Sequence, residues 1–282
     1  MRDDSVLITG ATGQVGRATI EALLRRGVKP TALVRRDAPL EGCATISDWL
    51  TSERAFTAIQ RATVVVHLAG NLNPPDHDYE RANIVPTQRV ASAVDSGAAR
   101  RLIFLSYVGA SEHSPNRYLA TKARAERMLQ ETGVPQTVFR CTHIIGSPQH
   151  PGPTAVTLLA GGKKSVKVLG NGKQRVAPVY LGDVVAAMDA AITSDHTGTF
   201  DLEGPDEMSF DDLVRLVNGA AKLSIAHVPA VLARLLQFVG PKLPGSLIDV
   251  MVHDSRSDHP TAHRVLGLSL RHLGEVWLRR RL

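Results

Sequence analysis

A glycine-rich turn near the amino terminus constrains the fold more than any other feature. Gly10, Gly13 and Gly16 lie three residues apart, after an apolar run at 5–8 and before a helical pattern at 18–24. The first glycine allows a tight turn, the second allows backbone N–H groups to approach a pyrophosphate, and the third allows the helix to pack close to the strand. We expect a diphosphate at the start of this helix, where unpaired N–H groups and the helix dipole favour negative charge.

The length and composition suit one large α/β domain with a smaller lobe. The chain has 282 residues, of which 43% are hydrophobic, so it can bury a sizeable core. Apolar runs at 28–34, 44–46, 63–70 and 99–106 alternate with helical patterns, which is typical of right-handed βαβ units. We therefore expect an α/β fold with a doubly wound parallel sheet, the Rossmann arrangement, and a smaller C-terminal substrate lobe.

The charge and the cysteine content favour a cytoplasmic protein that acts on small molecules. The net charge is +6, but basic residues are spread along the chain and aromatic residues make up 4%, too few for base stacking. Cys43 and Cys141 have no disulfide or metal-ligand spacing, so we expect a reducing compartment and no metal. No run approaches the roughly 20 apolar residues of a membrane span. We expect no nucleic-acid binding, no integral membrane association, and a monomer or dimer.

Two arginines follow the second predicted strand, where an NAD-preferring fold would place an acidic residue. Arg35 and Arg36 can hold a 2′-phosphate there, which favours NADP(H) over NAD(H), although a solvated arginine pair is the alternative. Asp48 follows the third strand, where related folds reach the adenine. His67 lies within the fourth strand and is expected to be structural.

A tyrosine and a lysine one helical turn apart are the candidate acid–base pair. Tyr118 and Lys122 share a helix face because residues i and i+4 do. A lysine in this position can stabilise the phenolate and bring the phenol pKa down from about 10. A solvated helix face is the alternative, but the upstream glycine turn favours the catalytic interpretation.

These motifs occur in the order found in the short-chain dehydrogenase/reductase superfamily, which the chain resembles over nearly its whole length. The motifs are the glycine turn, Arg35, His67-Leu68-Ala69-Gly70, Asn83, the strand that ends in Ser106, Tyr118 with Lys122, and Val138-Phe139-Arg140. The stretches 169–172, 178–184 and 198–205 are similar to its extended and atypical branch, in particular to NmrA-like proteins and complex I accessory dehydrogenase-like subunits. The resemblance implies that Lys122 holds the cofactor ribose and that Asn83 relays a proton through water.

The chain departs from the superfamily at the serine that bonds the substrate carbonyl. Alignment on Val108-Gly109 puts Tyr107 in the place of this serine, so that Tyr107, Ser106 or Ser111 would have to supply the hydrogen bond. Cys141 stands where many relatives have proline, and we expect it to pack rather than react.

We place the dinucleotide-binding domain at residues 1–145, with 183–204 returning to it. Residues 146–182 and 205–282 are the expected substrate-binding lobe and lid. Within the lid, 223–257 is expected to form apolar helical pieces, and a membrane-surface or partner-binding helix is the rival interpretation. His143 and His150 lie near the predicted ligand crevice, although solvent exposure is the favoured interpretation for both.

The sequence favours an NADP(H)-dependent ketoreductase or alcohol dehydrogenase that acts on a bulky apolar carbonyl compound, such as a polyketide or quinone-like metabolite. A non-catalytic NADP(H)-binding sensor or assembly subunit and a nucleotide-sugar epimerase or dehydratase are the alternatives. The candidate catalytic residues are Tyr118, Lys122, Ser106, Tyr107 and Asn83. The candidate cofactor-binding residues are Gly10, Thr12, Gly13, Gln14, Val15, Gly16, Arg35, Arg36, Asp48, Leu68, Ala69, Gly70, Lys122 and Cys141.

Overall fold

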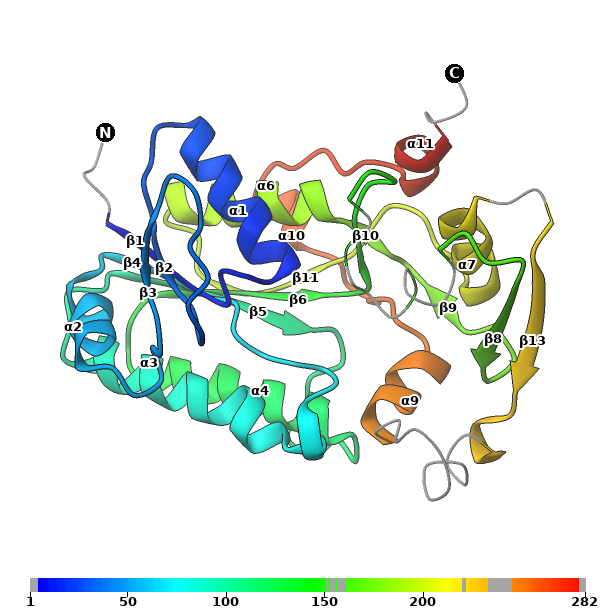
Figure 1. The fold of residues 1–282 in the computed structure, drawn as a ribbon, viewed down its shortest axis with the longest axis horizontal. Coiled ribbons are helices and arrows are strands. Elements are labelled where there is room, and N and C mark those ends of the chain that lie inside the picture. The colour runs from blue at the N-terminus through cyan, green and yellow to red at the C-terminus, as the bar shows by residue number, and fades with distance from the viewer. Residues whose placement is uncertain are drawn as a thin grey trace.

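A parallel sheet of seven strands forms the centre of the protein. The computed structural model describes residues 5–150, 152, 156, 161–219, 222–232 and 245–278. The strand order across the sheet is β11-β6-β5-β4-β1-β2-β3 (Figure 1). The strands are β1 (Val6–Thr9), β2 (Thr31–Leu33), β3 (Ala44–Ile46), β4 (Val64–His67), β5 (Arg101–Tyr107), β6 (Gln136–Cys141) and β11 (Gly198–Leu202).

Helices cover both faces of this sheet, which explains why its strands are apolar at consecutive positions. Figure 1 shows α1 (Gln14–Arg25), α6 (Leu181–Thr193) and α10 (Ala262–Val265) on one face. The other face carries α2 (Glu53–Arg61), α3 (Val85–Asp95) and α4 (Arg117–Gln130). Leu7 packs on the α2–α4 side and Ile8 on the α1–α6 side, so the residues of one strand contribute alternately to two cores.

A smaller C-terminal lobe lies beside the carboxyl end of the sheet. Its own apolar core joins residues of the lobe helices and of three short strand pairs. The pairs are β7 (Ile144–Ile145) with β10 (Val179–Tyr180), β9 (Arg175–Val176) with β12 (Met208–Ser209), and β8 (Ser165–Leu169) with β13 (Ser224–Val228). The lobe helices are α7 (Phe210–Asn218), α9 (Gly245–Val252) and α11 (Leu273–Leu278).

Local sequence signals explain where several helices begin. The side chain of Ser52 accepts a hydrogen bond from the Ala55 N–H at the start of α2, and Ser209 caps α7 in the same way. A 3₁₀ turn, η1 (Pro75–His77), and a π-helical turn, η2 (Glu80–Ile84), precede α3. Single π turns inside helices are frequent at functional sites, and η2 carries one of the candidate residues.

The doubly wound parallel fold with its smaller C-terminal lobe is confirmed, whereas one detail of the lobe was wrong. Residues 224–228, expected to be helical, form strand β13, because they pair in parallel with β8. Of the expected lid, residues 233–244 lie outside the described residues, so the lid stays a prediction. His67 is buried as expected, and its ring nitrogens lie 2.7 Å from Thr9 Oγ1 and 3.0 Å from Thr87 Oγ1.

Candidate functional site

The glycine turn leads from β1 into α1 and has no room for larger side chains. Gly10 has a φ of +68°, and a Cβ atom there would lie 2.6 Å from the Leu68 carbonyl carbon and 2.7 Å from the Ala69 nitrogen. A Cβ atom on Gly16 would lie 2.4 Å from the Gly10 oxygen. Gly13 precedes α1 without any side-chain cap, so the first N–H groups of the helix remain open to an anion.

The carboxyl end of β4 brings three candidate residues together. A Cβ atom on Gly70 would lie 2.9 Å from Asn83 Oδ1 and 3.7 Å from Lys122 Nζ. Asn83 is 2% exposed; its Oδ1 accepts from the Asn71 N–H at 2.9 Å, and its Nδ2 donates to Thr121 Oγ1 at 3.3 Å. The amide therefore links the β4 loop to α4 beside the lysine.

Lys122 extends from α4 toward the sheet. It is 5% exposed, its ammonium donates to the Leu105 carbonyl oxygen, and its Nζ lies 4.0 Å from the centre of the Phe104 ring. Burial lowers the pKa of Lys122 to about 8, although the nearby Glu126 carboxylate opposes this shift. The lysine is thus held next to Gly70 and Asn83, and its pKa of about 8 leaves it mostly protonated at neutral pH.

Tyr118 lies in the first turn of α4. The Asn116 side chain caps this helix by accepting hydrogen bonds from the N–H groups of Tyr118 and Leu119. Burial raises the pKa of the Tyr118 phenol, and the neighbouring Tyr107 raises it further. The expected lowering by Lys122 was therefore wrong for the protein alone, because desolvation dominates and the Lys122 ammonium is directed to the Leu105 oxygen.

Tyr107 stands at the end of β5 and faces Tyr118. The two ring centres are 5.9 Å apart, with an edge-on angle of 68°. The Tyr107 hydroxyl lies 2.9 Å from Ser255 Oγ and 3.4 Å from His143 Nδ1. Burial raises the pKa of Tyr107, so this phenol keeps its proton at neutral pH. Two phenols therefore meet where the superfamily pattern has one phenol and one serine.

Ser106 faces away from this pair, which corrects its place among the candidate donors. Its hydroxyl donates to a carboxylate oxygen of Glu126, and the same carboxylate binds Arg140 at 2.6 Å. Ser106 and Phe104 are two residues apart in β5, and both contact side chains farther along α4 than Tyr118, namely Glu126 and Lys122. Ser111 is exposed.

Cys141 and the two histidines differ sharply in environment. Cys141 is 1% exposed, and burial raises the pKa of its thiol, which suits the expected packing role and not a nucleophile. The favoured interpretation of His143 was wrong: its ring lies between Tyr107 and Phe210, and burial lowers its pKa to about 4. His150 is exposed. Sequence reasoning missed Ser255 altogether.

The residues predicted to select the cofactor lie at the same sheet edge as the glycine turn. Arg35 and Arg36 follow β2, which pairs with β1, and both are exposed. Asp48 is also exposed; its φ is +52°, and its carbonyl oxygen accepts hydrogen bonds from the N–H groups of Thr51 and Ser52. The structure gives these residues accessible positions, and their contacts with a cofactor stay predictions.

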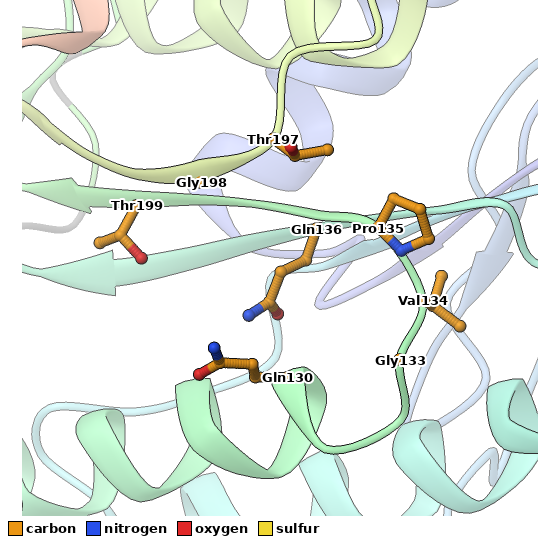
Figure 2. Close-up of a pocket in the computed structure, with 8 residues that line it drawn as sticks. All are labelled: Gln130, Gly133, Val134, Pro135, Gln136, Thr197, Gly198 and Thr199. Carbon is orange, nitrogen blue, oxygen red and sulfur yellow. The ribbon is translucent and has the colours of Figure 1, made fainter.

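A pocket of about 600 Å³ lies at the opposite edge of the sheet. Figure 2 shows the side chains of Gln130 and Gln136 facing each other there, beside Thr199. Gln136 and Thr199 stand at the amino ends of β6 and β11, whereas the Tyr118 group lies at the carboxyl ends. This pocket is therefore separate from the candidate active site.

Two further structural findings concern metals and membranes. In the described parts of the chain, no group of three or more His, Cys, Asp or Glu side chains lies close enough together to hold a metal ion. None of the helices described is long and apolar enough to cross a membrane.

With this geometry established, comparison with known proteins identifies the family. The chain matches the NAD dependent epimerase/dehydratase family over residues 6–202 and therefore belongs to this family. These are NAD(P)-dependent enzymes, oxidoreductases and epimerases among them, as the resemblance to the extended short-chain dehydrogenase/reductases implies. A nicotinamide dinucleotide fits the residues present, since the glycine turn excludes side chains and the start of α1 lacks a cap.

Several curated and solved proteins are similar to the chain. The mitochondrial NADH dehydrogenase [ubiquinone] 1 alpha subcomplex subunit 9 of Arabidopsis thaliana is 28% identical over 227 residues; the match covers 74% of this chain and 56% of that protein. Ceramide reductase of Caulobacter vibrioides is 28% identical over 258 residues, covering 86% of this chain and 77% of the relative. The structure of MoeE5 in complex with UDP-glucuronic acid and NAD superposes with a TM-score of 0.77 at 22% identity. The match covers 99% of this chain and 100% of the MoeE5 chain, which shows that the two share a fold.

Proposed function

We propose that the protein is an NADP(H)-dependent reductase of a bulky, apolar carbonyl compound, such as a polyketide or quinone-like metabolite. The observation that carries this proposal is the pairing of two protonated phenols, Tyr118 and Tyr107, beside Lys122 at the carboxyl end of the sheet. The dinucleotide, when bound, supplies the hydride to the carbonyl carbon. Tyr118 gives its proton to the carbonyl oxygen, which completes the alcohol.

Lys122 and Asn83 restore the proton and position the cofactor in this proposal. The Lys122 ammonium binds the cofactor ribose and favours the transient Tyr118 phenolate. Asn83, which joins the β4 loop to Thr121, holds the water through which Tyr118 recovers a proton. Arg35 and Arg36 bind the 2′-phosphate of NADP(H), supported by their exposure at the end of β2 and by the lack of an acidic residue at these two positions.

An apolar substrate is favoured by the charge of the groups near Tyr118. Tyr107, Ser255 and His143 are neutral at neutral pH, since burial keeps the pKa of His143 at about 4. A nucleotide sugar carries a diphosphate, whose burial requires cationic partners. In the lobe, Arg256 is paired with Asp258 and Arg271 with Asp183, so a carboxylate already partners each of these two guanidinium groups. The name of the ceramide reductase relative also supports a lipophilic carbonyl compound.

Two alternative functions each have an observation in their favour. A non-catalytic NADP(H)-binding subunit is favoured by the raised pKa of Tyr118 and by the absence of serine at position 107, and one relative is a subunit of NADH dehydrogenase. An epimerase or dehydratase acting on a nucleotide sugar is favoured by the shared fold with MoeE5.

Three measurements together distinguish these functions: steady-state oxidation of NADPH by carbonyl probes, titration of NADPH binding, and chromatography of UDP-glucose, since epimerisation causes no net oxidation of NADPH. The probes are 1-decalone, menadione and a 3-oxoacyl N-acetylcysteamine thioester, with UDP-glucose as the sugar control. Reduction of at least one carbonyl probe is expected, without change of UDP-glucose. Saturable NADPH binding without turnover of any probe would support the non-catalytic subunit instead, and conversion of UDP-glucose would support the epimerase.

A further inference from the structure

We propose that Ser255 is a positioning residue that holds the Tyr107 phenol, so that this phenol donates the hydrogen bond to the substrate oxygen in place of the missing serine. This inference rests on the proposed reductase function. The observation behind it is the 2.9 Å contact between Ser255 Oγ and the Tyr107 hydroxyl, which joins the lobe to the end of β5.

The backbone of Ser255 is fixed on both sides. Its N–H donates to the Arg175 carbonyl oxygen at 2.9 Å, and its carbonyl oxygen accepts from the Ala177 N–H at 3.0 Å. These bonds attach Ser255 to the β9 segment alongside Val176, and the residue is 1% exposed. Its hydroxyl therefore reaches Tyr107 from a rigid support rather than from a loose loop.

The hydrogen-bond geometry leaves the Tyr107 proton available to a substrate. Tyr107 has one hydrogen to donate and an oxygen that can accept. Either hydroxyl can be the donor in the Ser255–Tyr107 contact. When Ser255 donates, the Tyr107 hydrogen is left for His143 Nδ1 at 3.4 Å, a distance at which a hydrogen bond is weak. Neutral His143 can accept this hydrogen, and a carbonyl oxygen placed between the two phenols competes for it successfully.

A phenol needs this support more than a serine does. The tyrosine side chain carries its oxygen several ångströms from the backbone, so small rotations of the ring move the oxygen far. Contacts from Ser255 and His143 restrict these rotations, and the Tyr118 ring packs against the same phenol in an edge-on arrangement. Ser106 cannot take over, because its hydroxyl is bound to the Glu126 carboxylate, which lies about two helical turns beyond Tyr118 along α4.

The test compares Ser255→Ala with Ser257→Ala in the NADPH-dependent reduction of 1-decalone. Ser257 is a matched control, since it is also buried and its hydroxyl donates to Asp201 at 2.6 Å rather than to Tyr107. Ser255→Ala is expected to lower kcat/KM about tenfold, the effect of one net hydrogen bond, without changing NADPH affinity. Ser257→Ala is expected to keep the parent value, and Ser255→Thr, which retains a hydroxyl, to keep most of it.

A double-mutant cycle separates positioning from a general structural effect. If Ser255 acts through Tyr107, Ser255→Ala has no further effect in the Tyr107→Phe background, and Tyr107→Ser makes turnover independent of Ser255. An equal loss from Ser255→Ala in the parent and in Tyr107→Phe would overturn the proposal. So would an unchanged kcat/KM in Ser255→Ala.

A spectroscopic measurement reports on Ser255 without any turnover. 3-Fluorotyrosine placed at position 107 gives a ¹⁹F signal that is expected to shift and broaden in Ser255→Ala but not in Ser257→Ala. An unmoved signal overturns the positioning role even if decalone is reduced. A shifted signal in a protein that reduces none of the carbonyl probes overturns the proposed function and the donation to substrate, while it leaves the Ser255 contact intact.

Discussion

Replacing Gly10 by alanine tests whether the glycine turn is built for a cofactor. Gly10 and Gly27 both have left-handed φ values, +68° and +77°, so alanine costs roughly 1–2 kcal/mol of strain at either position. The two positions differ in the room for a side chain. A Cβ atom on Gly27 would have no atom within 4 Å, whereas a Cβ atom on Gly10 would lie 2.6 Å from the Leu68 carbonyl carbon. That distance is about 0.8 Å shorter than the 3.4 Å at which ordinary contact begins, so Gly10→Ala must move the turn away from β4.

The expected result is a loss of NADPH affinity that Gly27→Ala does not share. Moving the turn removes at least one backbone N–H bond to a phosphate, worth about 1.5–3 kcal/mol when one partner is charged. Gly10→Ala should therefore weaken NADPH binding at least about tenfold in calorimetric titration. Gly27→Ala should lower the melting temperature with no change in affinity. Equal NADPH affinity in the parent and in Gly10→Ala would refute the placement of the diphosphate at this turn.

Three more predictions concern the acid, the cofactor and the lysine. Tyr118→Phe should slow 1-decalone reduction roughly 10²–10⁴-fold in stopped-flow measurements with NADPH affinity nearly unchanged, and an unchanged rate would remove Tyr118 as the acid. Arg35→Asp should reverse the expected preference for NADPH over NADH, and equal affinity of the parent for both cofactors by calorimetry would contradict the 2′-phosphate site. Burial lowers the pKa of Lys122 from about 10.5 to about 8. Between pH 8 and pH 10.5 the unfolded state therefore binds more protons than the folded state, and Lys122 makes the free energy of unfolding rise with pH in this range. Urea titrations at pH 7.5 and 9.5 should show that the free energy of unfolding rises less between these two pH values in Lys122→Met than in the parent protein.

Local patterns in the sequence predicted the sheet and its glycine turn well. The bounds expected for β3 are those observed, because the apolar pattern of a strand acts within a few residues. The strand expected at 28–34 is shorter, since β2 covers Thr31–Leu33. Residues 224–228 were misread as helix because their pairing with β8, about 60 residues away, decides their conformation.

The candidate site shows where sequence reasoning ends. Strand alternation alone already separates Ser106 from Tyr107, since neighbouring side chains point to opposite faces, and Phe104 lies on the Ser106 side. Sequence reasoning could not find the partner of Tyr107. Ser255 is 148 positions away, and its contact depends on how the lobe, to which Ser255 is attached at Val176, lies at the carboxyl end of β5. A missing serine in the motif therefore signals an altered site, and the fold is needed to show that a distant serine contacts the tyrosine at this position.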